Sequence, residues 1–293
     1  MQLIAEVTMI NLTRAAICGI AIALAAPASA QTPGFRLEPA LTPSAVANTT
    51  VSPGPAQPTA AIECKAPSDF VRLAQPLLHA ARRLAANEPL TIVAIGSSST
   101  RGAGASSPAA SYPSRLAVEL TKRFPRADIT VLNRGVNGEE IQQMLARFPT
   151  DVIAAHPDLV LWQVGTNAVL RDRQLQPDAT LLRDGIKQIK DAGADAVLID
   201  MQFAPRVIAK SETPDMEDQI AHAAKEGSVD LFNRFAVMRE WHDVERIPFE
   251  AFVAPDGLHM NDWGYACVAK LLATAISDAA TRPVTSAAVR PRP

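Results

Sequence analysis

The chain has 293 residues, of which 48% are hydrophobic and 20% charged, and its formal net charge is −2 at pH 7. This composition is typical of a globular protein that is large enough to bury a substantial core. Because neither a basic excess nor a cluster of Lys and Arg is present, the sequence argues against a nucleic-acid partner and against a basic patch for membrane surfaces.

The first 30 residues predict a secretory signal peptide. Arg14 precedes an apolar run over residues 15–26, and Ala28-Ser29-Ala30 places small residues before a cleavage point at Gln31. That run is too short to span a bilayer comfortably. We therefore expect no transmembrane segment in the mature chain, and we expect export to the periplasm or the medium.

Residues 31–62 are rich in Pro, Ala and Thr and have neither helix nor strand periodicity, which predicts a disordered linker. Residues 281–293 have a similar composition and predict a disordered tail. The folded domain is therefore expected over residues 63–280.

Between these tails, apolar segments with strand character alternate with helical patterns. The expected strands cover residues 91–95, 129–132, 159–164, 196–200 and 229–232. The helical patterns place these apolar residues on one face of each helix: Leu116, Leu120 and Phe124; Leu182, Ile186 and Ile189; Val268, Leu271 and Leu272. Gly193 is expected to cap the second helix, and the third is expected to begin near Asn261 or Asp262. This alternation predicts an α/β fold with a parallel sheet covered on both faces, and its site is expected at the carboxyl ends of the strands.

Four polar segments with glycine or serine follow the predicted strands or precede the last helix. They are Gly96–Thr100, Asn133–Glu139, Gly165–Ala168 and Asp256–His259. Alone, the serine-rich turn is compatible with an ordinary loop or a phosphate cradle. Together, the segments contain the parts that acyl transfer requires.

In that chemistry, Ser98 attacks the carbonyl carbon, His259 takes the hydroxyl proton, and Asp256 orients the imidazole. An oxyanion hole must also donate hydrogen bonds to the oxygen that becomes negative. The backbone amides of Ser98 and Gly138 and the side-chain amide of Asn167 are the candidate donors.

With these four segments in this order, residues 64–280 resemble the SGNH or GDSL hydrolases. The resemblance implies a flavodoxin-like three-layer α/β/α sandwich with a central five-stranded parallel sheet. It also implies activity as an esterase, a lipase or a carbohydrate deacetylase. The family motifs fall on these residues: Ser98, Asp256 and His259 as the triad, and Gly138 and Asn167 as oxyanion donors.

The chain departs from the family pattern at two positions. Ser97 stands where an aspartate gives the GDSL motif its name, and Ala168 stands where an acid often follows the oxyanion asparagine. These departures affect the expected supporting hydrogen bonds and any inference about the substrate. The segment around Ser98 also lacks Gly-x-Ser-x-Gly, which argues against the nucleophile elbow of the α/β-hydrolases.

These features predict an exported serine esterase that forms an acyl-enzyme at Ser98 and releases it with water activated by His259. Because no long hydrophobic insertion resembles a lipase lid, short acyl groups are favoured, such as O-acetyl on carbohydrate. The alternatives are a lysophospholipase or thioesterase with the same residues, or a non-catalytic glycan-binding module. No pair of histidines has metal-ligand spacing, so neither a metal nor a cofactor is expected. The expected partner is a small-molecule or carbohydrate ester, and the oligomeric state is left open.

The cysteines favour one disulfide. Removal of the signal peptide takes away Cys18 and leaves Cys64 and Cys267, an even pair in an exported protein. A bond between them would join the beginning of the domain to its end and would contribute roughly 4–5 kcal/mol in the chain-entropy model. Two separate buried thiols are the alternative.

Other residues near these segments are expected to have structural roles. Arg134 and Glu139, on either side of Gly138 in the sequence, are expected to form a local ion pair, with substrate contact as the alternative. Most aromatic residues before Asp256 are expected in the core rather than in an acyl or sugar pocket: Phe232, Phe235, Trp241, Phe249 and Phe252, with Met238. Four further histidines lack a carboxylate at the spacing of the Asp256–His259 segment: His79, His156, His222 and His242. His79 and His222 are expected in surface or packing roles on helices. His242 is expected on a solvated helix face, with a second polar cluster beside Asp243 as the alternative.

Overall fold

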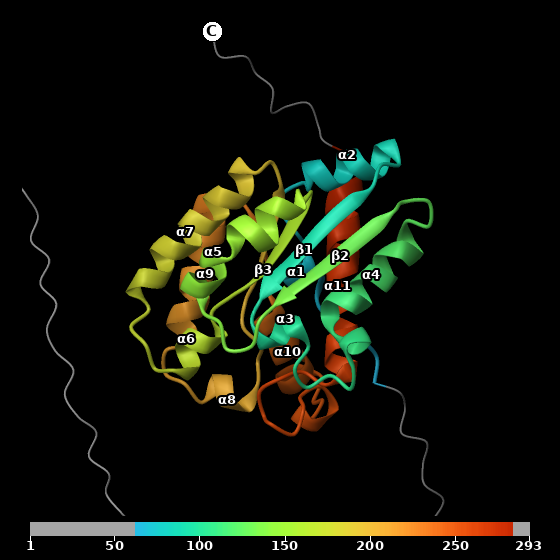
Figure 1. Ribbon diagram of the computed structural model, residues 1–293. Coiled ribbons are helices and arrows are strands. Elements are labelled where there is room, and N and C mark those ends of the chain that lie inside the picture. Colours follow the sequence, from blue (N-terminus) through green and yellow to red (C-terminus); the bar gives the residue numbers. More distant parts are fainter. Residues whose placement is uncertain (1–61, 284–293) are drawn as a thin grey trace, which may run out of the picture. The chain divides into compact units, whose positions relative to one another are not determined.

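The computed structural model describes residues 62–283, so the predicted signal peptide and all but the last residue of the predicted linker lie outside the described residues. The centre of the described part is a parallel sheet with the strand order β2-β1-β3-β4-β5 (Figure 1). The strands are β1 (Leu90–Gly96), β2 (Ile129–Gly135), β3 (Leu159–Gln163), β4 (Asp195–Ile199) and β5 (Asp230–Phe232). The five predicted strands and their parallel pairing are confirmed.

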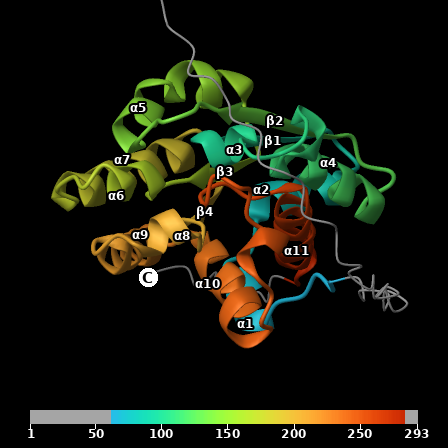
Figure 2. The same cartoon turned by 90° about the horizontal axis from the view of Figure 1, so that it is seen from below.

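Helices cover both faces of the sheet and give the three layers of the predicted α/β/α sandwich (Figures 1 and 2). One face carries α5 (Ile141–Ala146), α7 (Gln176–Asp191) and α9 (Thr213–Gly227). The other face carries α2 (Leu78–Ala86), α4 (Tyr112–Arg123) and α11 (Asp262–Thr281). The shorter helices are α1 (Ser68–Val71), α3 (Ser98–Arg101), α6 (Thr166–Leu170), α8 (Pro205–Ile208) and α10 (Arg234–Arg239). Single 3₁₀ or π turns lie at Pro108–Ala110, Phe148–Val152, Ile153–Ala155, Glu240–Val244 and Phe249–Ala251.

The position of β1 within the sheet determines where the site forms. β1 lies between β2 and β3. The chain therefore passes from β1 to the strand on one side and then adds β3, β4 and β5 on the other side, so the order in which strands are added reverses next to β1. In open parallel sheets, ligands bind outside the carboxyl ends of the strands at such a switch point. The segments that follow β1, β2 and β3 therefore meet at one place, and these are the segments with the predicted serine, glycine and asparagine.

The sequence signals for the helix ends are also found in the structure. Gly193, just after α7, has a φ of +75°, and its amide donates to the carbonyl of Lys190 at 3.0 Å. At the start of α11, the side chain of Asn261 accepts a hydrogen bond from the amide of Gly264 at 3.0 Å. Both arrangements satisfy backbone groups that a helix end would otherwise leave unpaired.

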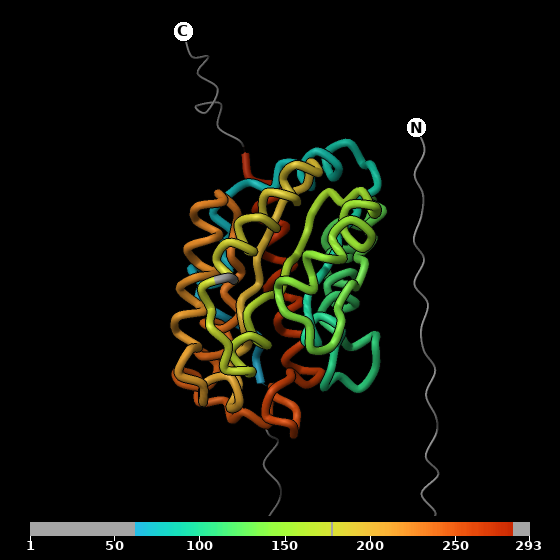
Figure 3. Tube along the Cα trace, turned by 60° about the vertical axis from the view of Figure 1, so that its left-hand side comes forward, coloured from blue at the N-terminus to red at the C-terminus, as the bar shows by residue number. Residues whose placement is uncertain are grey.

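Segments near the two ends of the described chain, drawn in blue and in red, pack together because α11 contacts both α1 and α2 (Figures 1 and 3). The predicted disulfide between Cys64 and Cys267 is present, with Cα atoms 5.4 Å apart. Helix α11 continues to Thr281, and the guanidinium of Arg282 donates to the carbonyl of Leu73 at 2.9 Å. Ordered structure therefore extends past the predicted domain boundary at residue 280. Among residues 62–283, no helix has both the length and the hydrophobicity needed to cross a membrane.

Candidate active site

Two glycines allow the turn that carries Ser98. Gly96 ends β1, and a Cβ added there would lie 2.2 Å from Oγ1 of Thr100. On the neighbouring strand, a Cβ added to Gly135 would lie 2.1 Å from the backbone nitrogen of Arg101. Because neither strand end has a side chain at these points, α3 packs directly against both of them. Ser98, the first residue of α3, is thereby held at the carboxyl edge of the sheet.

The structure brings Ser98, His259 and Asp256 together in one hydrogen-bonded chain. Nε2 of His259 lies 2.8 Å from Oγ of Ser98, and Nδ1 of His259 lies 2.5 Å from Oδ2 of Asp256. The side chain of His259 is 14% exposed, whereas that of Asp256 is 41% exposed. A hydroxyl, an imidazole and a carboxylate in this order can pass a proton away from the serine and stabilise the resulting imidazolium.

The turn around Asp256 keeps its carboxylate in the ionised form. Oδ1 of Asp256 accepts hydrogen bonds from the amides of Leu258 and His259, each at 3.0 Å. Burial raises the pKa of Asp256, but the hydrogen bonds from the His259 side chain and from these two amides outweigh burial, and the pKa lies below its usual value. The carboxylate is therefore charged at neutral pH while it orients the imidazole.

The backbone at Gly104 lies close to the side chain of His259. Gly104 has a φ of +85°, and a Cβ added there would lie 2.8 Å from Cβ of His259. A side chain at this position would be strained and would displace the histidine.

Gly138 lies on the loop that follows β2, and Asn167 lies in the first turn of α6, just after β3. Gly138 has a φ of +77°, a conformation that favours glycine. Nδ2 of Asn167 donates to the carbonyl of Glu139 at 2.8 Å, which uses one of its two N–H groups. Within residues 62–283, the backbone amides of Ser98 and Gly138 have no hydrogen-bond acceptor. In the described fold, the two predicted backbone donors therefore have no acceptor, and Asn167 keeps one N–H available.

Two arginines that follow α6 bind the loop that contains Gly138. Arg171 donates to the carbonyl of Gly138 at 2.8 Å and also pairs with Glu140. Arg173 pairs with the second oxygen of the Glu140 carboxylate at 2.5 Å. The loop is thus fixed both through its backbone and through a side chain, which restricts the direction of the Gly138 peptide.

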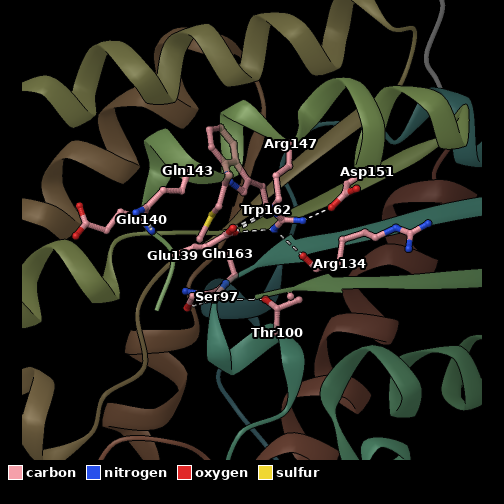
Figure 4. Close-up of polar contacts among 12 residues, drawn as sticks. Ser97, Thr100, Arg134, Glu139, Glu140, Gln143, Arg147, Asp151, Trp162 and Gln163 are labelled. Carbon is pink, nitrogen blue, oxygen red and sulfur yellow. Dashed lines mark hydrogen bonds and ion pairs between the residues drawn. The ribbon is translucent and has the colours of Figure 1, made fainter. Parts of the chain in front are cut away.

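The predicted ion pair between Arg134 and Glu139 is wrong. Glu139 pairs with Arg147 at 2.6 Å, and Arg147 also pairs with Asp151 (Figure 4). Arg134 contributes only its carbonyl, which accepts a hydrogen bond from Arg147 at 3.0 Å. Its side chain extends from the edge strand β2 away from Glu139 in Figure 4, so the two charges do not meet.

Ser97, which replaces the family aspartate, is bound to Gln163 at the end of β3. Oε1 of Gln163 accepts hydrogen bonds from the amide and the hydroxyl of Ser97, each at 3.0 Å, and from Oγ1 of Thr100 at 3.3 Å (Figure 4). A carboxylate at position 97 would face this carboxamide oxygen and repel it. The second departure, Ala168, is only 2% exposed and packs in the core.

Three residues beside the site were not identified from the sequence: Gln163, Gln202 and Arg171. Gln163 lay inside the predicted strand over residues 159–164 and carried no signal of its own, whereas the only signal for Gln202 was its position just after the strand predicted over residues 196–200. Arg171 had no distinguishing signal, since its contact with Gly138 joins two separate loops.

The aromatic residues before Asp256 belong mainly to the core, as expected. The buried members are Phe232, Phe235, Trp241 and Phe252, and Met238 is buried with them. Phe249 is half-buried and stacks on His242 with ring centroids 4.0 Å apart. Between residues 62 and 283, no group of three or more His, Cys, Asp or Glu side chains is placed to hold a metal ion.

A family model and a curated relative match the sequence. The model, described as the Non-GDSL lipase-like family, matches residues 63–282. An arylesterase of Vibrio mimicus is 34% identical over 95 residues, which cover 32% of this chain and 46% of that protein. The chain therefore spans about half the length of the curated relative it matches.

Solved structures with the same fold include two acetyl esterases. A two-domain esterase active on acetylated mannans has a TM-score of 0.64 and 22% identity, covering 76% of this chain and 60% of that chain. An acetylxylan esterase from Geobacillus stearothermophilus has a TM-score of 0.54 and 21% identity, covering 64% and 94%. Since the family model spans the folded domain, the chain belongs to the Non-GDSL lipase-like family.

Proposed function

We propose that this protein is an exported serine esterase that hydrolyses carboxylic esters through an acyl-enzyme on Ser98. The observation that carries the proposal is the hydrogen-bonded chain from Ser98 through His259 to Asp256, beside two backbone amides with no acceptor among the described residues. A glycan-binding module would not require a serine hydroxyl bonded to an imidazole that is in turn held by a carboxylate. The esterases among the relatives support the same reaction class.

In the first half of the reaction, Oγ of Ser98 attacks the ester carbonyl while Nε2 of His259 takes the hydroxyl proton. The carbonyl oxygen becomes negative in the tetrahedral intermediate. The amides of Ser98 and Gly138 and the second N–H of Asn167 then donate to that oxygen, and each such donor is worth about 3–4 kcal/mol. The intermediate collapses when His259 protonates the leaving alkoxide, which leaves the acyl group on Ser98.

In the second half, water replaces the alcohol. His259 takes a proton from water, the hydroxide attacks the acyl carbon, and the same oxyanion donors stabilise the second intermediate. Proton return from His259 to Oγ of Ser98 releases the carboxylic acid and restores the free enzyme. Throughout, Asp256 holds Nδ1 protonated, so that Nε2 remains the acceptor.

For the substrate, we propose short acyl groups, with O-acetyl groups on carbohydrate as the leading class. Two of the related structures are esterases described as acting on acetylated mannans and on acetylated xylan, which supports this class. The Cys64–Cys267 disulfide supports an exported location, where oxidising conditions maintain such bonds.

The decisive experiment measures hydrolysis of p-nitrophenyl acetate by the wild-type protein and by Ser98→Ala. The matched control is Ser211→Ala, which alters an exposed serine that bonds only to its neighbour Glu212. We expect Ser98→Ala to lose at least about 10³-fold in kcat, and Ser211→Ala to retain wild-type rates. Wild-type turnover that survives in Ser98→Ala would refute the proposed nucleophile.

A chain-length series then tests the substrate class. We expect acetyl and propionyl esters to be hydrolysed faster than octanoyl and longer esters, and we expect acetate release from acetylated xylan or mannan. A preference for long acyl chains or for lysophospholipids would favour the lysophospholipase alternative. Binding of glycans without Ser98-dependent hydrolysis would favour the binding module.

A further inference from the structure

One buried carboxamide connects three segments of the candidate site. Gln202 follows β4 and is 1% exposed. Its Oε1 accepts hydrogen bonds from Oγ of Ser99 at 3.3 Å and from Oγ1 of Thr166 at 3.1 Å. Its Nε2 donates to the carbonyl of Leu258 at 3.2 Å. Each partner is the immediate sequence neighbour of a proposed site residue: Ser98, Asn167 and His259.

Arg234 fixes the orientation of this carboxamide. The guanidinium of Arg234 is 1% exposed and donates to Oε1 of Gln202 at 3.0 Å and to the carbonyl of Asp200 at 2.5 Å. Because a guanidinium has donors only, it must face the oxygen of the carboxamide, and the nitrogen must then face the carbonyl of Leu258. A charged donor also strengthens the hydrogen bond. Gln202 therefore has a single orientation that satisfies all of its partners.

The burial of the charged Arg234 side chain is unfavourable, because the guanidinium loses its contact with water. Burial lowers the pKa of Arg234, although the nearby charge of Asp200 opposes that shift. Nε of Arg234 is buried and has no hydrogen-bond partner in the described part of the chain. A whole buried ion pair can often be replaced by apolar residues without loss of stability, so stability alone does not account for the buried charge of Arg234. Its position against Gln202 indicates a role in the geometry of the site.

We propose that Gln202 is a positioning residue for ester hydrolysis, and that Arg234 keeps it in the productive orientation. This inference rests on the proposed function. Gln202 bonds to the residue after the nucleophile and to the residue before the base, so it controls the separation between Ser98 and His259. A displacement of about 1 Å in such a geometry costs about 10²-fold in rate. Gln163 differs because its oxygen contacts only the turn that carries Ser98.

The test measures kcat and KM for p-nitrophenyl acetate with Gln202→Leu in the full chain. Leucine is similar in size but removes the hydrogen bonds. We expect kcat to fall by about 10- to 100-fold. KM should stay within about threefold, because Gln202 is buried and is not exposed to a bound substrate. Gln202→Glu keeps an acceptor for Ser99 and Thr166 but places a carboxylate oxygen against the carbonyl of Leu258, so its kcat is also expected to fall below wild type.

Two controls separate positioning from loss of stability. Gln188→Leu makes the same change on the exposed face of α7 and is expected to have no effect. Asp230→Asn weakens the hydrogen bonds that Asp230, at the amino end of β5, accepts from the amides of Ala74 and Gln75, and it is expected to lower Tm without lowering kcat. Thermal unfolding followed by circular dichroism confirms that each variant is folded at the assay temperature.

The outcomes distinguish this inference from the proposed function. Folded Gln202→Leu with a kcat within threefold of wild type would overturn the positioning role. If Gln202→Leu does not fold, Gln202→Glu decides, and an unchanged kcat in that variant overturns the role. If Asp230→Asn lowers kcat as much as Gln202→Leu does, the effect of Gln202 is one of stability alone. Wild-type protein without Ser98-dependent turnover would overturn the proposed function and this inference with it.

Discussion

Replacement of Asp256 by Asn tests the electrostatic part of the proposed mechanism. Asparagine keeps the size of the side chain, and its oxygen can still accept from the amides of Leu258 and His259. Its NH₂ group then faces Nδ1 of His259 in place of the carboxylate oxygen that lies 2.5 Å away. The neutral imidazole must then accept at Nδ1 and carry its proton on Nε2, where it cannot accept the proton of Ser98.

The size of the effect follows from the geometry. A carboxylate and an imidazolium with charge centres about 4 Å apart interact by about 4 kcal/mol at an effective permittivity near 20. Because the side chain of Asp256 is 41% exposed, solvent screens the charge, and we take about half of that value. The unfavourable tautomer adds about 1–2 kcal/mol, so the total corresponds to a loss of about 10²- to 10³-fold in kcat.

The assay is steady-state hydrolysis of p-nitrophenyl acetate at pH 8 by the wild type, Asp256→Asn and Asp278→Asn. Asp278 is an exposed acid on α11 far along the helix from the site, so its variant controls for the loss of one charge. We expect KM to change little in Asp256→Asn, because the carboxylate orients the base rather than the substrate. A kcat for Asp256→Asn within tenfold of wild type, with the fold intact, would refute the electrostatic argument.

Two further predictions concern stability. Reduction of the bond between Cys64 and Cys267, or replacement of both cysteines by serine, is expected to lower the free energy of unfolding by about 5 kcal/mol, because the bond closes a loop with a separation of 203 residues. Urea unfolding with and without reductant measures the change, and equal unfolding midpoints would contradict this expectation. Burial raises the pKa of Asp200 to about 7, so the folded state retains a proton that the unfolded state releases above pH ~4. Stability should therefore fall by the order of 2–3 kcal/mol between pH 5 and pH 8. Asp200→Asn, which keeps an acceptor for the Phe235 amide, should reduce this slope, and an unchanged slope in urea titrations would show that Asp200 is not its source.

The sheet and the candidate site could be predicted because their signals are local. Each strand is a short apolar run, and strands that alternate with helices leave few possible topologies. In a parallel sheet, the carboxyl ends of adjacent strands lie at one edge, so Ser98, Gly138 and Asn167 could be placed together without knowledge of side-chain geometry. The pairing of Cys64 with Cys267 followed from counting the cysteines that would remain after removal of the predicted signal peptide.

The residues that support the site could not be predicted in the same way. The partner of Glu139 depends on which arginine the turn after α5 directs toward it, and the sequence distance favoured Arg134 over the actual partner Arg147. Gln202 and Arg234 have no characteristic spacing, and their role depends on contacts among segments that are distant in the chain. Such contacts are a property of tertiary packing, which a pattern of residue types does not contain.

The disulfide closes the folded domain into a covalent ring that contains every residue of the candidate site. During synthesis, Cys64 emerges 203 residues before Cys267, so the bond can form only after the chain has been made as far as the first turns of the last helix. A protease that cuts one exposed loop within this ring would leave the two pieces linked through the sulfur atoms. After a cut between Ser98 and His259, the two pieces that carry these residues would still be joined covalently. Their association would therefore stay intramolecular and independent of protein concentration.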